Sequence, residues 1–215
     1  MDLSQPSSIP DLLVANLPRG LVLSVEEALE VGARRAFPVA EDMHKGHRPT
    51  VLGQMRHFHM NETFAEALEV SGACPSPLKG NDVVVGRAGI LLLGRFNISD
   101  GPWYNARRSR SRRVMSKANR AIEHLVHLPL LFEPIPPITA ATVFFVGVFN
   151  GSMKDSPDRP VSIDIAVPDG EMKSWLFREP VSQFVQRYNA AEPQQDLAVP
   201  VLKASTAQKN KESGS

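Results

Sequence analysis

The stretch ITAATVFFVGVF, residues 138–149, is an almost unbroken apolar run of about a dozen residues. Its β-branched and aromatic side chains predict a buried β-strand over Thr139–Phe149. A helix that spans a membrane needs roughly 18 consecutive apolar residues, and this run is shorter. We therefore expect a strand in the core of a folded domain, and no membrane span.

Further strands are predicted on both sides of this run. Downstream, residues 161–167 and 171–177 are apolar and β-branched, and they are joined by Pro168-Asp169-Gly170, which is typical of a hairpin turn. Upstream, residues 83–96 are rich in Val, Leu and Ile but are interrupted between Gly86 and Gly89. This pattern predicts two strands, or one bent strand.

Helical patterns occupy much of the remaining chain. Capping boxes at Ser24 and at Thr63 predict two short helices, over about 25–36 and from Thr63 to Gly72. A long helix is predicted over about 104–128, with Val114 on its buried face, and a closing helix over 181–188. Together these elements predict an α+β fold, with an antiparallel sheet of about four to five strands packed with three to four helices.

The chain length favours a single folded domain. It has 215 residues, with 42% hydrophobic and 22% charged residues, which is ordinary globular composition. We expect a flexible N-terminal arm over 1–14, one α+β domain over 15–190, and a disordered C-terminal tail over 191–215 that is rich in Lys, Gln, Glu and Ser.

Charge and cysteine content limit the classes of function. Lys and Arg number 24 against 23 Asp and Glu, so a net charge of +1 gives no overall attraction to nucleic acid or anionic membranes. The polar start of the chain lacks a secretory signal, so we expect a cytoplasmic protein. The single cysteine, Cys74, cannot form an internal disulfide or a CxxC site, and we expect no metal and no cofactor.

One predicted helix is strongly basic, with seven Arg and Lys residues among the fourteen of 107–120. On a helical wheel, Arg110, Arg113, Lys117 and Arg120 fall on one stripe, which could follow a phosphate backbone. This indicates a nucleic-acid contact. The alternative is an ordinary solvated helix face whose charge is balanced by acidic residues elsewhere.

Three patterns bear on enzymatic activity. Arg120 followed by His127 resembles the Arg-His pair of HEPN ribonucleases, which implies an all-helical fold, whereas three strands are predicted to follow this helix. A ribonuclease toxin that uses this helix with His124 or His127 is the alternative function.

The other two patterns are a nuclease motif and a histidine pair. Asp158 with Glu171-Met172-Lys173 resembles the PD-(D/E)xK nucleases, but in a hairpin with its turn at 168–170 Glu171 would pair with Val167, far from Asp158. His57 and His59 would lie on one side of an extended segment near Glu62, without a firm third metal ligand. We therefore predict no catalytic residue.

The segment Gln54-Met55-Arg56-His57-Phe58 matches a peptide pattern with glutamine first, an aliphatic residue second and an aromatic residue fifth. In a peptide-in-groove contact the amide binds at the mouth and the apolar side chains fill the pocket, roles that fit Gln54, Met55 and Phe58. Arg48 ahead of the segment and Arg56 within it are expected to rim the contact, which suits an acidic partner. The alternative is that Leu52, Met55 and Phe58 form the core stripe of a helix.

This peptide resembles the motif by which many bacterial proteins bind the DNA polymerase sliding clamp, with His57 where an aliphatic residue is usual. A small protein with such a peptide and no active site resembles the SocB-like replication-blocking toxins. The resemblance implies a toxin-antitoxin system, in which Gln54, Met55 and Phe58 compete with polymerase subunits for the clamp. It also implies an antitoxin that acts as a proteolytic adaptor, and a protease.

Overall fold

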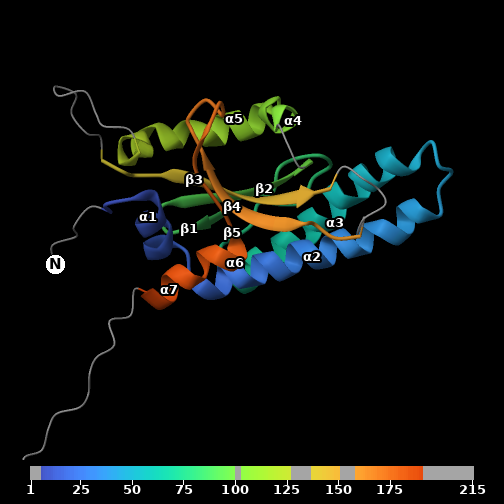
Figure 1. The fold of residues 1–215 in the computed structure, drawn as a ribbon, viewed down its shortest axis with the longest axis horizontal. Coiled ribbons are helices and arrows are strands. Elements are labelled where there is room, and N and C mark those ends of the chain that lie inside the picture. The colour runs from blue at the N-terminus through green and yellow to red at the C-terminus, as the bar shows by residue number, and fades with distance from the viewer. Residues whose placement is uncertain (1–5, 100–102, 127–136, 151–157, 191–215) are drawn as a thin grey trace, which may run out of the picture.

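The computed structural model describes residues 6–99, 103–126, 137–150 and 158–190. Three layers build the fold, with a sheet between a long helical hairpin on one face and a short broken helix on the other (Figure 1). No helix in these described ranges combines the length and the apolar character that crossing a lipid bilayer requires.

The sheet contains five strands that are neighbours in chain order. They are β1 (Gly86–Ala88), β2 (Leu91–Ser99), β3 (Ala141–Phe149), β4 (Ser162–Pro168) and β5 (Trp175–Pro180). All neighbouring pairs are antiparallel except β2 and β3, which are parallel because the chain crosses one face of the sheet between them. The predicted α+β class with a mainly antiparallel sheet is confirmed.

The central strand is the apolar run from which the sequence analysis began. All nine residues of β3 are buried, so apolar side chains extend from both faces of the sheet. Phe145 packs against Phe64 of the helical hairpin, with ring centroids 6.2 Å apart, while Phe144 contacts Phe96 of the neighbouring strand β2 at 5.2 Å on the opposite face of the sheet. A strand covered on both faces has no polar alternation, which explains the continuous pattern.

The larger helical layer consists of α1 (Ile9–Asn16), α2 (Arg19–Glu41), α3 (Arg48–Val70), α6 (Val181–Phe184) and α7 (Gln186–Ala190). The predicted flexible arm over 1–14 is wrong for α1. Ser8 caps this helix by accepting a hydrogen bond from the Asp11 amide at 3.3 Å, and Ile9, Leu12 and Leu13 are buried. The predicted tail over 191–215 lies outside the described residues.

The helices α2 and α3 form a long antiparallel hairpin, and both are longer than predicted. Thr63 was expected to cap a helix but lies inside α3, where its hydroxyl donates to the His59 carbonyl at 3.1 Å. Gly32 of α2 lets the helices approach closely, because a Cβ there would lie 2.7 Å from the Met60 Cα. Tertiary packing therefore extends helical structure beyond the local capping signals.

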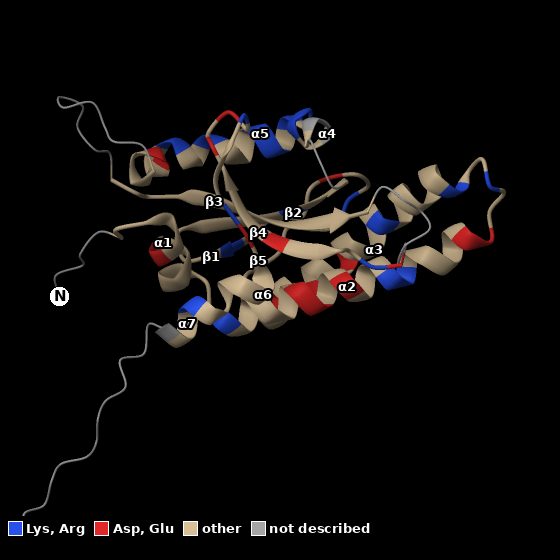
Figure 2. Cartoon of the chain, viewed as in Figure 1, with Lys and Arg blue, Asp and Glu red and all other residues tan. Residues whose placement is uncertain are grey.

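The opposite layer is formed by α4 (Tyr104–Arg107), α5 (Arg110–Ser116) and a 3₁₀ helix, η1 (Lys117–Leu125). The predicted continuous helix over 104–128 is broken, since Ser109 starts a new helix by accepting from the Arg112 amide at 3.4 Å. Val114, predicted to be buried, is 57% exposed. Figure 2 shows basic residues along this layer, whereas α2 in the opposite layer carries both acidic and basic residues.

Candidate functional site

The segment Gln54–Phe58 lies inside α3, which begins at Arg48, well ahead of Thr63, where the sequence predicted a helix to start. The alternative of a helical core stripe is correct in part. Leu52 is 2% exposed and packs with Ala36 and Ala40 of α2, and Met55 packs against this small cluster. The helix is therefore the resting conformation of the segment.

The three candidate residues have different exposures. Gln54 is exposed, whereas Met55 and Phe58 are half-buried. Residues four apart share a helix face, so Gln54 and Phe58 lie together, while Met55 is rotated by about 100° toward α2. Phe58 contacts the His57 ring, with centroids 5.6 Å apart. The structure thus brings two of the three residues together at the surface and holds the third in the hairpin interface.

The two arginines expected to rim the contact, Arg48 and Arg56, are less available than predicted. Arg56 places its guanidinium carbon 3.8 Å from the centre of the Phe149 ring, and burial lowers its pKa to about 10. Arg48 donates from Nε to the Met43 carbonyl at 2.8 Å near the hairpin turn. The expectation of two arginines on a free rim is therefore wrong for Arg56, which stacks on the sheet.

A buried group of cations lies behind the segment. Arg95 of β2 is 4% exposed and donates from Nη2 to the His57 carbonyl at 3.3 Å, while its Nε and Nη1 have no partner in the described structure. Arg112 of α5 lies over the Phe96 ring at 4.8 Å. Burial, and then the charges of Arg95 and Arg112, lower the pKa of His57. The buried cations Arg95 and Arg112 therefore disfavour any further positive charge beside His57.

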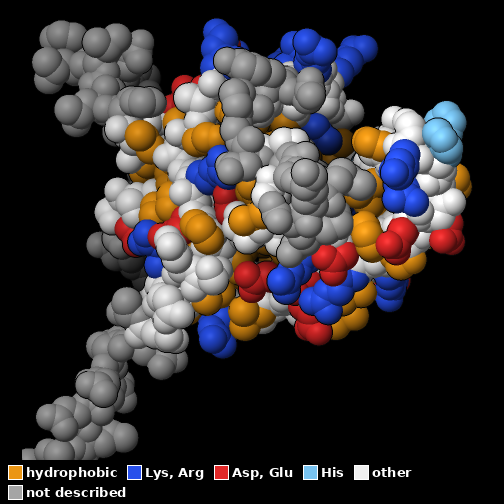
Figure 3. All heavy atoms as spheres, turned by 45° about the vertical axis from the view of Figure 1, so that its right-hand side comes forward, with side chains coloured by type: hydrophobic (Ala, Val, Ile, Leu, Met, Phe, Trp, Pro, Cys, Tyr) orange, Lys and Arg blue, Asp and Glu red, His pale blue; other side chains and the backbone are white. Residues whose placement is uncertain are grey.

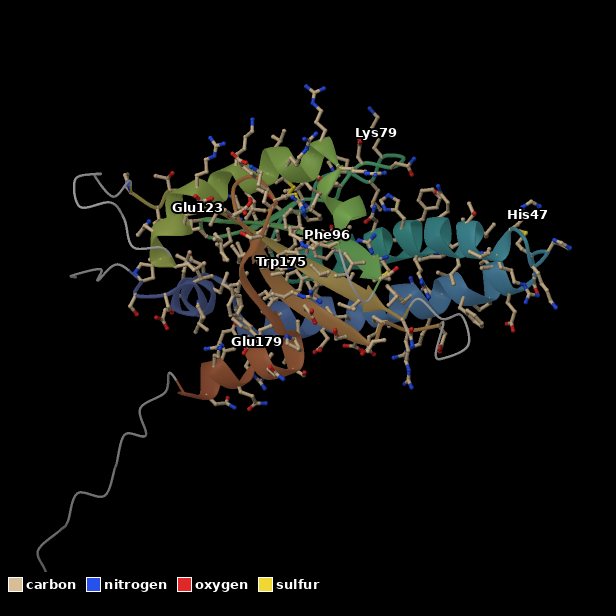
Figure 4. The ribbon with its side chains drawn as sticks, turned by 45° about the horizontal axis from the view of Figure 1, so that its top comes forward. His47, Lys79, Phe96, Glu123, Trp175 and Glu179 are labelled. Atoms are coloured by element: carbon tan, nitrogen blue, oxygen red, sulfur yellow. The ribbon has the colours of Figure 1, made fainter. Side chains whose placement is uncertain are left out.

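The turn end of the hairpin, next to the segment, extends past the sheet, and His47 marks it at the far right of Figure 4. Its small apolar cluster is separate from the main core. Pro38 lies inside α2 near this end, where it removes one helical hydrogen bond. Gly53 weakens α3 beside the segment and has open space around it. We infer that this end has a lower local stability than the main core.

A second candidate surface lies on the basic helix layer. Lys173, in the loop between β4 and β5, faces α5 and η1 across two adjoining hollows of about 500 and 700 Å³. We call this surface the basic groove; its helical side consists of Arg107, Arg108, Arg110, Arg113, Lys117 and Arg120. Figure 3 shows basic side chains along the top of the molecule, over this layer. The four residues predicted to share a stripe all line one hollow.

Sequence reasoning missed Lys173 as part of this surface, because the β4–β5 connection differs from the predicted hairpin. The loop runs over 169–174, and Pro168 pairs with Trp175. The Asp169 carboxylate organises it by accepting from the amides of Lys173 and Ser174 at 2.8 and 2.7 Å. An aspartate at the start of such a turn was the available signal.

The catalytic patterns do not assemble into a site within the described residues. His127 lies outside them, and His124 is half-buried, with its Nδ1 enclosed and without a partner among the described residues. Glu171 lies in a loop, not opposite Val167 as predicted, and it forms ion pairs with Arg120 and Lys173. A group of three His, Cys, Asp or Glu residues that could hold a metal ion does not occur in the ranges described.

The histidine pair of the sequence analysis is also separated. His57 and His59 lie on a helix, so they face different directions. His59 Nδ1 is 3.0 Å from Glu62 Oε2, whereas His57 Nε2 is 3.3 Å from the Asn61 amide nitrogen. The two imidazoles therefore have separate structural partners.

Comparison with protein families, curated proteins and solved structures finds no match to this chain.

Proposed function

We propose that this protein binds the bacterial DNA polymerase sliding clamp through residues 54–58 and blocks replication by competing with polymerase subunits. The observation that carries the proposal is the position of Gln54 and Phe58. Gln54 is exposed and Phe58 half-buried on one face of α3, in the half of this helix that is nearer the hairpin turn. A partner can therefore reach both side chains without disturbing the main core.

In the proposed complex, the Gln54 amide binds at the mouth of the clamp pocket, and Met55 and Phe58 fill it. These three side chains reach one pocket together only if the segment leaves the helical conformation, because Met55 faces α2 in the closed hairpin. Apolar surface that Met55 loses against Ala36 and Ala40 is regained in the pocket. Pro38 and Gly53 lower the cost of this opening.

We call the form in which residues 54–58 have left the helix the open form, and in this proposal only a small fraction of the molecules adopt it at any time. The apparent dissociation constant equals the intrinsic one divided by the fraction of molecules in the open form. Any substitution that stabilises the helix at this end weakens clamp binding, even where it leaves Gln54, Met55 and Phe58 unchanged. This separates the proposal from binding by a rigid helix face.

The resemblance to SocB-like toxins extends the proposal to regulation in a toxin-antitoxin system in the cytoplasm. Toxicity follows from occupancy of the clamp, without a catalytic step. An antitoxin that acts as a proteolytic adaptor would deliver the protein to a protease and so limit its amount. The expected result is a longer half-life of this protein in cells that lack the adaptor.

The direct experiment measures binding of the full chain to purified sliding clamp by surface plasmon resonance. Gln54→Ala and Phe58→Ala are each expected to weaken binding by about 30-fold, the effect of losing a residue worth about 2 kcal/mol at an interface. Glu66→Ala, at another exposed position of α3, is the matched control and is expected to bind as the wild type does. Circular dichroism verifies that each variant is folded.

A competing synthetic clamp-binding peptide is expected to displace the wild-type protein, because both occupy the same pocket. The proposal is overturned if the wild type does not bind the clamp. It is also overturned if Gln54→Ala and Phe58→Ala bind as well as Glu66→Ala, or if the peptide and the protein bind simultaneously.

A further inference from the structure

The basic groove has far more cations than its surroundings neutralise. Glu171 is the one acidic residue among the described residues that line its two hollows, and it is already shared between Arg120, at 3.7 Å, and Lys173. No ion pair joins Arg110, Arg113 or Lys117 to a residue in the described ranges of the chain. The surface is therefore not the balanced helix face that the sequence left open as an alternative.

Both sides of the groove are held in place before any partner binds. Asn119 of η1 is fully buried and donates to the carbonyls of Thr142 and Pro168 at 3.0 and 2.7 Å. The Glu123 carboxylate accepts from the Gly170 amide at 2.9 Å, which ties the loop of Lys173 to the helix. A partner thus meets cations on a preformed scaffold, at a smaller loss of conformational entropy.

We propose that the basic groove binds the phosphate backbone of duplex DNA without sequence preference. From Arg107 to Arg120 the chain covers on the order of 20 Å, since α5 rises about 1.5 Å and the 3₁₀ helix η1 about 2 Å per residue. About 12 phosphate charges lie along that length of a DNA duplex, counting both strands, so the six cations can each meet a phosphate. This inference is independent of the clamp, because the groove and residues 54–58 are on separate surfaces.

The composition of the groove favours a duplex over a single strand. Single-strand binding surfaces present aromatic rings on which bases stack. Trp103, beside the groove, is instead stacked on Trp175 with ring centroids 3.8 Å apart, in the layer between α5 and the sheet. The described residues that line the groove include no aromatic ring on which an unstacked base could stack. The cations of the groove therefore fit a duplex, whose bases remain paired.

The hydrogen-bond donors that line the basic groove also favour DNA over RNA. They further favour contact with phosphates over contact with bases. The described residues that line the two hollows include no Ser, Thr, Asn or Gln side chain. Amides and hydroxyls are common groups for reading base edges, and recognition of duplex RNA depends strongly on its 2′-hydroxyls. Arg and Lys side chains donate either to phosphate oxygens or to guanine edges, and only the phosphate contacts, which position a protein without reading sequence, are part of this proposal.

The layered charge distribution adds an orientation to the proposed complex. Basic residues line the α5 layer, whereas α2 on the far side of the sheet carries a mixture of acidic and basic residues (Figure 2). An approaching duplex is therefore attracted mainly to the face that bears the basic groove. The overall charge of +1 hides this local excess, because acidic residues elsewhere in the chain balance it in the sum.

The test is fluorescence anisotropy of a labelled 20-base-pair DNA duplex with the full-length wild type at several salt concentrations. The logarithm of the association constant is expected to fall linearly with the logarithm of salt concentration, with a slope of about −5 for six phosphate contacts. The double variant Arg113→Ala, Lys117→Ala is expected to bind at least ten-fold more weakly and to reduce the slope by about 2.

Matched variants separate a local effect from a change of net charge. Arg34→Ala, Arg35→Ala removes the same charge from the exposed face of α2 and is expected to leave DNA binding unchanged. Glu171→Gln frees Arg120 and Lys173 and is expected to strengthen binding several-fold at low salt. Gln54→Ala is expected to bind DNA as the wild type does, so this proposal and the clamp proposal fail separately.

Several results would overturn the inference. If the wild-type protein does not bind the duplex at 50 mM salt, the basic groove is not a DNA-binding site. Equal loss of binding in the α2 double variant would show that only net charge matters. Tighter binding of single-stranded DNA or of an RNA duplex would show that the groove binds that polymer instead. If poly-glutamate displaces the labelled duplex as effectively as unlabelled DNA does, the groove binds an acidic protein instead.

Discussion

The Arg95 side chain of β2 donates a hydrogen bond to the backbone carbonyl of His57 in α3, over a distance of 3.3 Å. This contact joins the sheet to the segment proposed to bind the clamp. The guanidinium is buried, and its Nε and Nη1 atoms have no partner in the described structure. Burial and the nearby charge of Arg112 lower the pKa of Arg95 to about 9.

Arg95→Met is expected to raise the free energy of unfolding by about 1 kcal/mol, because a buried charge without an acidic partner costs more than an apolar side chain of similar size. Urea unfolding followed by circular dichroism measures the change. Arg87→Met, at an exposed position of β1, is the control and is expected to have little effect. A loss of stability in the Arg95 variant would show instead that the guanidinium stabilises the junction.

The stability of the protein is expected to fall as the pH falls through the range in which His57 titrates. Burial and the charges of Arg95 and Arg112 lower the pKa of His57 in the folded state below its ordinary value of 6.5. The neutral imidazole is therefore favoured on folding, so the contribution to stability is complete above pH 6.5 and is lost as pH falls through the lowered folded pKa. Urea unfolding at pH 7.5, 6 and 5 measures this loss.

His57→Gln removes this contribution and is expected to flatten the dependence of stability on pH between 7.5 and 5. His59→Gln is the control, because His59 lies beside Glu62 at 3.0 Å instead of beside arginines. If the wild type and His57→Gln lose the same stability over this range, His57 does not carry the pH dependence.

Two glycines of the helical hairpin are expected to respond oppositely to alanine. A Cβ at Gly32 would lie 2.7 Å from the Met60 Cα, so Gly32→Ala forces the helices apart and is expected to cost about 2 kcal/mol of stability. A Cβ at Gly53 would have no neighbouring atom within 4 Å, so Gly53→Ala is expected to add up to about 1 kcal/mol through helix propensity. Thermal unfolding measures both.

Gly53→Ala also tests the opening of the clamp-binding segment. If binding requires the segment to leave the helix, a gain of about 1 kcal/mol in helix stability weakens clamp binding about five-fold. Surface plasmon resonance with the purified clamp measures this effect. Unchanged or tighter binding in Gly53→Ala would indicate that the clamp binds the closed helix.

Asn119→Ala is expected to cost about 3 kcal/mol of stability, because it leaves buried backbone groups without partners. The Asn119 side chain accepts from the Thr142 amide at 2.6 Å and donates to the carbonyls of Thr142 and Pro168. Ser111→Ala, at an exposed position of α5, is the control for urea unfolding. An equal effect of the two substitutions would show that Asn119 does not anchor this layer.

The sequence alone determined the α+β class and the approximate positions of the strands. The run over 138–149 predicted β3, because a strand buried on both faces is continuously apolar. Residues 83–96 predicted two strands or one bent strand, and the structure has the two strands β1 and β2. The stripe of Arg110, Arg113, Lys117 and Arg120 was also visible, since side-chain positions within one or two helical turns depend mainly on local geometry.

Only the tertiary structure decided the conformation of residues 54–58 and the partners of the basic helix. Packing of α3 on α2 extended a helix through a segment with weak local signals, and so moved Met55 into an interface. The hydrogen bond from Arg95 to the His57 carbonyl and the position of Lys173 opposite α5 both depend on contacts between elements that are distant in the chain. Such contacts depend on how layers pack, and a local sequence pattern does not encode that arrangement.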